Sequence, residues 1–314
     1  KISNKTGDWG DYLRSAVAAL HHADYELQVG FKGVIEGTLP IGGLSSSAAI
    51  IILYLRALCD LNNIKLDRDQ LVALAHYAEA VYIGLNNGIL DQSCEVYSKK
   101  DGLLFLDTRD SSYKVIPQPK RMPHYEFAIV FSGVEHALIN SAYNSRVDEC
   151  KAAAYALKAY AGMPYDKVAD SVLGDIAPEI YEKYKKKLPH NWQKRAEHFY
   201  SEVERVRQGV EAWRKGDLHA FGQLVFASGD SSINNYESGS PELKKLHEIA
   251  RHTDGIYGGR FSGAGFKGCY MAIIDPRYEQ KIARAFQEEY LEAFPELAPR
   301  FSVHFSHSAD GVKL

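Results

Sequence analysis

The chain has 314 residues, of which 46% are hydrophobic and 25% are charged, proportions that are ordinary for a globular protein. Its 37 basic and 40 acidic residues give a formal net charge of −3, so no global field attracts nucleic acid or a membrane surface. The longest uncharged apolar run, residues 48–55, is far shorter than the roughly 20 residues that cross a bilayer. The composition therefore favours a packed protein with a small-molecule partner, and the length allows two domains.

The four cysteines are widely separated and form no CxxC pair, so they indicate neither a disulfide framework nor a zinc site. Together with the lack of a signal-peptide pattern, this usage predicts a cytoplasmic protein. The sequence starts at Lys1 without an initiator methionine, and a preceding segment is therefore expected.

The first predicted elements are a helix over residues 9–23 and a strand over residues 27–37. Tyr12, Val17 and Leu20 recur on one face at helical spacing, whereas apolar and other side chains alternate in the second segment. A helix and a strand therefore precede the first motif that carries chemistry.

A glycine-then-serine turn follows that strand and runs into an apolar, helix-forming segment, residues 50–58. Glycines let the backbone approach a ligand, serines add hydroxyl donors, and the start of a helix presents unpaired N–H groups. This pattern is typical of a phosphate-binding loop, with a serine-capped core helix as the alternative. The residues of the turn are Gly42, Gly43, Leu44, Ser45, Ser46, Ser47 and Ala48.

The next predicted helix covers residues 67–84. An Asp-x-x-Gln capping box begins at Asp67, and Gly84 stands where such a helix should stop. Glu79 on this helix lies twelve residues before Asp91, at the expected start of a further helix, so the two carboxylates can converge on one pocket. Two acids beside an anion-binding turn suggest a metal-dependent phosphate site, although Asp91 alone would also suit a helix N-cap.

Two strands are predicted after that site, over residues 103–106 and 127–131, and a proline-rich, turn-forming stretch separates them. We place the domain junction there, which gives an N-terminal domain over residues 1–120 and a C-terminal domain over residues 121–314. The C-terminal domain contains a long predicted helix over residues 195–215 with a glycine stop.

A literal GxGxxG motif occupies residues 263–268, so a dinucleotide-binding oxidoreductase is one interpretation. That fingerprint normally sits between a strand and a helix, whereas residues 269–274 are typical of a strand. A glycine bulge between two strands is the competing interpretation.

Three segments, residues 40–49, 82–93 and 258–269, taken in this order, resemble the GHMP kinases, a superfamily of small-molecule kinases. Within it, Gly88–Gln92 looks like the catalytic-aspartate motif of the galactokinase branch, and the segment from Tyr143 looks like its sugar-contacting tyrosine segment. The resemblance continues to the C-terminus and covers nearly the whole chain, through residues 195–198, 235–237, 241–243 and 309–311.

This resemblance implies an α+β protein with the two-domain GHMP kinase fold. Its N-terminal domain would resemble domain 2 of ribosomal protein S5 and bind ATP, its C-terminal domain would be ferredoxin-like, and the active site would lie between them. The charge balance and the short apolar runs predict that the protein binds neither nucleic acid nor a membrane, and a monomer or weak homodimer is expected.

The implied chemistry is phosphoryl transfer from ATP to a sugar or sugar acid. The ATP phosphates would lie at residues 42–48, Mg²⁺ would be held by Ser47 and Glu79, and Asp91 would accept the proton of the anomeric hydroxyl. The implied sugar contacts are Gly88, Asp91, Tyr143, Gly263 and Gly265.

Finer details are more similar to the galacturonokinases than to ordinary galactokinases: Leu90 precedes the aspartate, and Lys267 stands in the last glycine loop. A cation such as Lys267 or Arg260 could favour an anionic sugar. The implied activity is phosphorylation of galacturonic acid to galacturonate 1-phosphate, with galactose as the alternative substrate and a non-catalytic, galactokinase-like sugar sensor as a further alternative.

Two departures from the family pattern accompany these likenesses. The turn before Ser45 is one residue shorter than the usual galactokinase loop, and no Arg-x-Asn-Leu-Ile-Gly-Glu-His-like motif occurs between Lys1 and Asp24. That motif supplies a catalytic arginine and several sugar contacts in the family, so the expected preceding segment would have to carry it.

Overall fold

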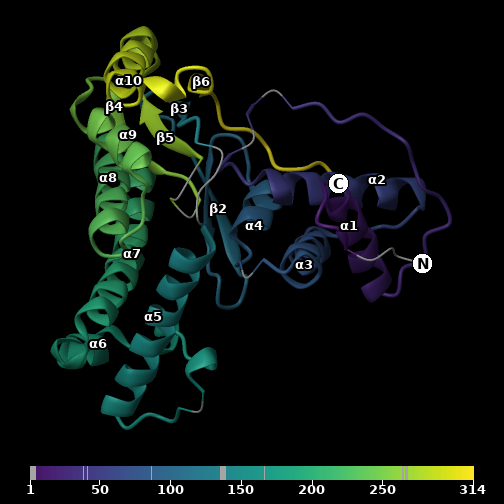
Figure 1. The fold of residues 1–314 in the computed structure, drawn as a ribbon, viewed down its shortest axis with the longest axis horizontal. Coiled ribbons are helices and arrows are strands. Elements are labelled where there is room, and N and C mark those ends of the chain that lie inside the picture. Colours follow the sequence, from purple (N-terminus) through teal and green to yellow (C-terminus); the bar gives the residue numbers. More distant parts are fainter. Residues whose placement is uncertain are drawn as a thin grey trace. The chain divides into compact units, whose positions relative to one another are not determined.

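A computed structural model describes residues 5–37, 39–40, 42–85, 87–134, 139–165, 167–263, 265 and 268–314, apart from the side chains of residues 139–143. Contacts divide the chain into two compact units (Figure 1). Unit 1 comprises Lys1–Gln118 and Ser308–Leu314, and unit 2 comprises Pro119–His307. The division falls in the proline-rich stretch, but the last residues of the chain, which the sequence placed with the C-terminal domain, group with unit 1.

Unit 1 consists of helices followed by one hairpin. Its helices are α1 (Asp11–His22), α2 (Ser46–Leu61), α3 (Arg68–Tyr77), the π-helical turn η1 (Ala78–Ile83) and α4 (Leu90–Tyr97), and its antiparallel strands are β1 (Gly102–Leu106) and β2 (Tyr113–Pro117).

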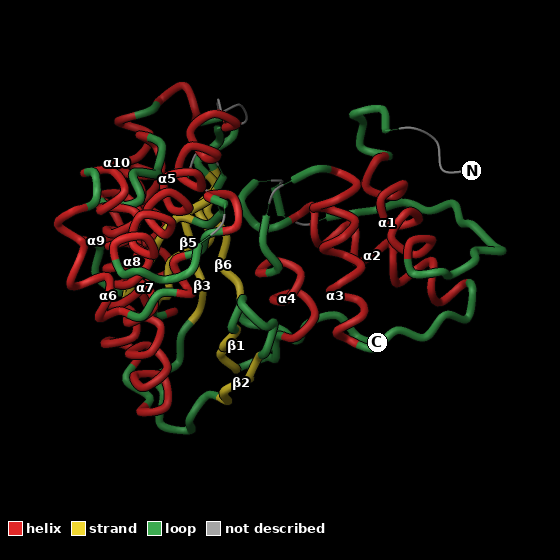
Figure 2. The backbone as a smooth tube through the Cα atoms, turned by 90° about the horizontal axis from the view of Figure 1, so that it is seen from below, coloured by secondary structure: helices red, strands yellow, loops and turns green. Residues whose placement is uncertain are grey.

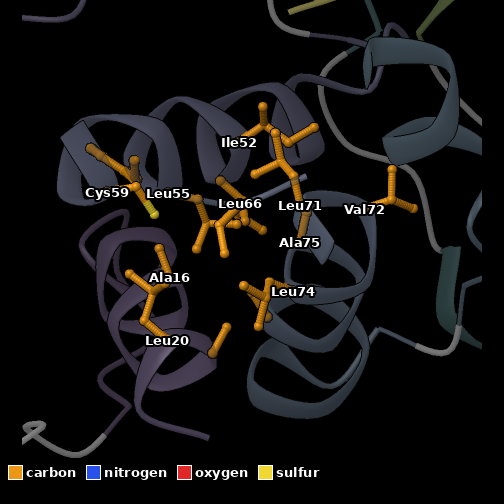
Figure 3. Close-up of a cluster of buried hydrophobic side chains, with 14 of the residues drawn as sticks. Ala16, Leu20, Ile52, Leu55, Cys59, Leu66, Leu71, Val72, Leu74 and Ala75 are labelled. Carbon is orange, nitrogen blue, oxygen red and sulfur yellow. The ribbon is translucent and has the colours of Figure 1, made fainter. Parts of the chain in front are cut away.

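The core of unit 1 lies where α1, α2 and α3 meet (Figure 3). Leu20, Leu55 and Leu71 come from these three helices and are fully buried. Burying a leucine side chain stabilises a fold by about 1.5–3 kcal/mol, so this contact holds the unit together. The predicted capping box is confirmed, because the Asp67 carboxylate accepts from Gln70 N at 2.8 Å and Gln70 Oε1 accepts from Asp67 N at 2.9 Å.

The predicted strand over residues 27–37 is wrong. The segment is irregular in the structure, and Val34 is 97% exposed. An alternating pattern forms a strand only where a neighbouring strand takes its N–H and C=O groups. Here a side chain does so instead: Asn62 Oδ1 accepts from Val29 N, and Asn62 Nδ2 donates to Val29 O, both at 2.9 Å.

Unit 2 has a four-stranded antiparallel sheet in the order β4-β5-β3-β6. Figure 2 shows these strands in yellow beside the helices of the same unit. β4 and β5 form an antiparallel hairpin, and α10 leads from β5 into β6. In chain order the strands are thus arranged 2-3-1-4, which is the order of a ferredoxin-like sheet. The strands are β3 (Glu126–Phe131), β4 (Ile256–Phe261), β5 (Cys269–Ile274) and β6 (Ser302–Ser306).

The core of unit 2 lies between this sheet and three helices, where Phe226 of α8, Leu246 of α9 and Phe286 of α10 are buried. A smaller buried cluster joins α5, α6 and α7. The helices are α5 (Ile139–Tyr160), α6 (Pro178–Tyr184), α7 (His190–Lys215), α8 (Leu218–Asn234), α9 (Pro241–His252) and α10 (Glu279–Ala293).

The two-domain α+β fold predicted from the sequence is confirmed, as are the helices over residues 9–23, 67–84 and 195–215 within a few positions. The three predicted strands over residues 103–106, 127–131 and 269–274 are confirmed as β1, β3 and β5. Within the described part of the chain, no helix is both long enough and apolar enough to cross a membrane.

Candidate active site

The glycine-serine turn enters α2 through a left-handed residue. Gly43 has φ +73° and Ser45 has φ +55°, while Ser46 is the first residue of α2. A left-handed residue followed by a helical one turns successive N–H groups toward one side, and such a concavity binds anions. The positive end of the helix dipole lies at the same place.

The alternative of a serine-capped core helix is not supported, because Ser45 at the N-cap makes no side-chain capping hydrogen bond. Its hydroxyl and the first N–H groups of α2 are therefore not committed to such a cap. Ser47 is half-buried and Ala48 is buried in the first turn of α2. The local geometry thus suits the predicted phosphate contacts at residues 42–48.

Glu79 lies on the apolar face of the helix formed by α3 and η1. Leu71, Leu74, Ala75 and Ala78 are buried at helical spacing, and Glu79 takes the next core position with 1% exposure. π-Helical turns are rare in proteins, and those that occur are often found at functional sites. The sequence thus places a carboxylate where a hydrophobic side chain would ordinarily pack.

Two amides satisfy this carboxylate. Gln92 Nε2 donates to Glu79 Oε2 at 2.5 Å, and Asn87 Nδ2 donates to the same oxygen at 2.9 Å. No lysine, arginine or histidine that the structure describes forms an ion pair with Glu79. The buried negative charge is therefore hydrogen-bonded but not neutralised, which is the condition that a bound cation relieves.

Three buried polar atoms close to this carboxylate in sequence have no hydrogen-bond partner: Asn87 Oδ1, Gln92 Oε1 and Ser93 Oγ. No group of three or more acidic, histidine or cysteine side chains in the described residues could hold a metal alone. A cation at Glu79 would therefore take its remaining ligands from hydroxyl, phosphate or water oxygens, which are donors that Mg²⁺ prefers.

Asp91 is the second residue of α4 and is half-buried. The N-cap of α4 is Ile89, so the alternative role of Asp91 as an N-cap is wrong. Its position in the first turn suits a carboxylate, because the helix dipole is positive there. Burial, followed by the nearby charges of Asp91 and Glu79, raises the pKa of Glu95 to about 8. The carboxyl groups of Glu79, Asp91 and Glu95 thus lie close enough to one another to interact electrostatically.

The candidate residues of unit 2 lie in the loop between β4 and β5. Gly263 has φ +69° and Gly265 has φ +79°, and a Cβ at Gly265 would lie 2.4 Å from the Phe261 ring. The two strands pair as an antiparallel hairpin, so the dinucleotide-binding interpretation is wrong. Lys267 lies outside the described residues, as does the side chain of Tyr143.

Arg260 is already paired within unit 2. Its Nη1 donates to Ser228 Oγ and lies 3.5 Å from Glu202 Oε2, and its Nη2 donates to Ser232 Oγ at 3.3 Å. Because its guanidinium is already held by a carboxylate and two hydroxyls, Arg260 is a poor candidate for the cationic side chain that would bind the substrate carboxylate.

Comparisons with known proteins agree with this fold and these motifs. The family model of the GHMP kinases N-terminal domain matches residues 11–99, and that of the GHMP kinases C-terminal domain matches residues 210–292. A galacturonokinase of Arabidopsis thaliana is 38% identical over 299 residues, covering 94% of this chain and 70% of the relative. A galactokinase of Roseiflexus sp. is 31% identical, covering 99% and 77%.

The structure of Lactococcus lactis galactokinase complexed with galactose matches with a TM-score of 0.87 and 29% identity, covering 99% of this chain and 78% of that one. The mevalonate kinase of Methanococcus jannaschii matches with a TM-score of 0.62 and 18% identity, a likeness of fold alone. The chain therefore belongs to the GHMP kinase family. Within that family it is a sugar kinase that uses ATP.

Sequence reasoning missed the two amides that bond Glu79. Gln92 follows the predicted catalytic aspartate directly, and Asn87 lies in the loop before it. The only available signal was the core position of Glu79, since a carboxylate on an apolar helix face needs polar partners.

Proposed function

We propose that the chain is a sugar 1-kinase that transfers the γ-phosphoryl group of ATP to the anomeric hydroxyl of galacturonic acid. The observation that carries this proposal is the identity of 38% to a plant galacturonokinase, compared with 31–34% to several bacterial galactokinases. Galactose is the second candidate substrate, which the structural likeness to a galactokinase complexed with galactose favours.

In the proposed reaction, the N–H groups of residues 42–48 bind the ATP phosphates at the start of α2. Asp91 orients the anomeric hydroxyl and accepts its proton as the new bond from the sugar oxygen to phosphorus forms and the bond from phosphorus to ADP breaks. The product is a sugar 1-phosphate. Alignment and charge neutralisation supply most of the rate, because phosphoryl transfer requires little covalent help.

We propose Mg²⁺ as the cation at Glu79, with the Ser47 hydroxyl as its second protein ligand. When bound, the ion would neutralise phosphate oxygens. The residues fit it, because Glu79 is a buried carboxylate that no described lysine, arginine or histidine pairs with, and Ser47 offers a half-buried hydroxyl at the start of α2; both are hard oxygen donors. The helices that carry them pack against each other.

We propose that the sugar contacts five residues: Gly88, Asp91, Tyr143, Gly263 and Gly265. Lys267 is the remaining candidate for binding the substrate carboxylate, since Arg260 is internally paired. A carboxylate paired with a cation gives strong discrimination against a neutral sugar. We also propose a cytoplasmic location, which the four free cysteines support, and a monomer or weak homodimer.

Steady-state kinetics on the full-length protein test the substrate. We expect kcat/KM for galacturonate to exceed that for galactose by at least about tenfold. Lys267→Met should remove most of that preference, whereas Lys32→Met, an exposed lysine in unit 1, should leave it unchanged. A preference for galactose would replace the substrate with the second candidate, and no transfer to any sugar would favour the sugar sensor.

A further inference from the structure

The hydrogen bonds around Glu79 join three segments of unit 1 at one oxygen. Glu79 comes from η1, Asn87 from the loop after it, and Gln92 from α4. Both amides donate to Oε2 rather than one to each oxygen. Two donors converging on one oxygen fix the rotation of the carboxylate, because turning it would break both bonds.

The orientation of both amides follows from the chemistry of the carboxylate. An ionised carboxylate only accepts hydrogen bonds, so each amide must turn its nitrogen toward Glu79 and its oxygen away. Asn87 Oδ1 and Gln92 Oε1 are consequently left without a partner although they are buried. Leaving a buried acceptor unpaired is destabilising, and two apolar residues at these positions would have avoided that cost.

The loop that carries Asn87 is itself tied to the helix. His76 Nε2 donates to the Asn87 carbonyl at 3.1 Å, and Leu85 N donates to the Glu79 carbonyl at 3.2 Å. Gln92 is fully buried and follows Asp91 on the first turn of α4. The carboxylate of Glu79 and the backbone that bears Asp91 are therefore held in one arrangement.

We infer that Gln92 and Asn87 are positioning residues that hold the Glu79 carboxylate ready for a divalent cation. Through Gln92, the same bonds fix the cation site relative to Asp91. The inference deepens the proposed function, since it takes Glu79 to be the metal ligand. The observed contact of both amides is with the Glu79 carboxylate, so the role that we infer for them is to position that ligand. Partners of this kind typically change metal affinity by 10–100-fold when they are replaced.

Manganese binding to the full-length protein in the presence of ADP provides a readout apart from activity, with free Mn²⁺ followed by electron paramagnetic resonance. Gln92→Met keeps the length and removes the donor, and we expect the Kd for Mn²⁺ to rise about tenfold. Asn87→Ala, at a half-buried loop position, removes the hydrogen bond from Asn87 to Glu79. It provides the test if Gln92→Met does not fold.

Gln70→Met is the matched control, because Gln70 lies on the same helix as Glu79 but only caps its start. It should lower Tm while leaving Kd unchanged. Wild-type Kd in both Gln92→Met and Asn87→Ala, or an equal rise in Gln70→Met, would overturn the inference and reduce the amides to structural partners. That result would leave the proposed function standing, because phosphoryl transfer to the sugar is measured separately on the wild-type protein.

Discussion

Replacing Gly311 should loosen the end of α4, the helix that carries Asp91. Gly311 N donates to Ser98 O and Val312 N donates to Glu95 O, both at 2.8 Å, so the chain terminus satisfies carbonyls at the end of α4. A Cβ at position 311 would lie 2.7 Å from Glu95 O and 2.8 Å from Val96 O. Gly311→Ala must therefore push the terminal segment away from the helix.

The expected cost follows from these contacts. Losing two hydrogen bonds costs about 0.5–1.5 kcal/mol each, and any carbonyl left buried without a donor adds about 1–3 kcal/mol. We therefore expect Gly311→Ala to lower the free energy of unfolding by about 2–4 kcal/mol, measured by urea denaturation, with faster amide exchange at the end of α4.

Gly37→Ala is the matched control, since a Cβ there meets nothing within 4 Å. It should change stability by no more than about 0.5 kcal/mol. A loss below that value for Gly311→Ala would show that the contact between the terminal segment and α4 is not a stabilising one.

Three further predictions concern the candidate site. Asp91→Asn should keep ATP binding and lower turnover by roughly 10²-fold or more, since the amide cannot accept the proton; near-wild-type turnover would remove Asp91 from the mechanism. Ser47→Ala and Glu79→Ala should each raise the Mg²⁺ concentration needed for half-maximal rate, with a double-mutant effect smaller than the sum; additive losses at unchanged Mg²⁺ dependence would make both residues structural. Because the pKa of Glu95 is raised to about 8, the folded state holds a proton that the unfolded state releases above about pH 4.5, so this group makes stability fall as the pH rises from about 5 to 8. Glu95→Gln should flatten that decline in urea titrations, and an unchanged pH dependence would contradict the shift.

The motifs were predictable because each is continuous in sequence. The turn at residues 42–48 leads into α2, and Asp91 lies in the first turn of α4. The capping box at Asp67 is likewise a local pattern. Such features depend on hydrogen bonds within a few residues, which sequence displays directly.

The remaining features depend on contacts between distant segments. The prediction of a strand over residues 27–37 was wrong because a strand requires a neighbouring strand, which the local pattern does not specify. The side chain of Asn62 instead forms hydrogen bonds with the backbone of Val29. The terminal segment at Gly311 joins unit 1 through bonds to Glu95 and Ser98, more than two hundred residues earlier in the chain. The amides at Glu79 likewise follow from packing rather than from spacing.

The position of the transferred phosphoryl group on the sugar distinguishes a sugar 1-kinase from other phosphotransferases. The full-length protein should be incubated with ATP, Mg²⁺ and galacturonate or galactose, and the products should be followed by ³¹P nuclear magnetic resonance. We expect a sugar phosphorylated at the anomeric oxygen together with an equal amount of ADP, formed at least roughly 10²-fold more slowly with Asp91→Asn. A phosphate on another hydroxyl, or release of inorganic phosphate alone, would contradict this expectation.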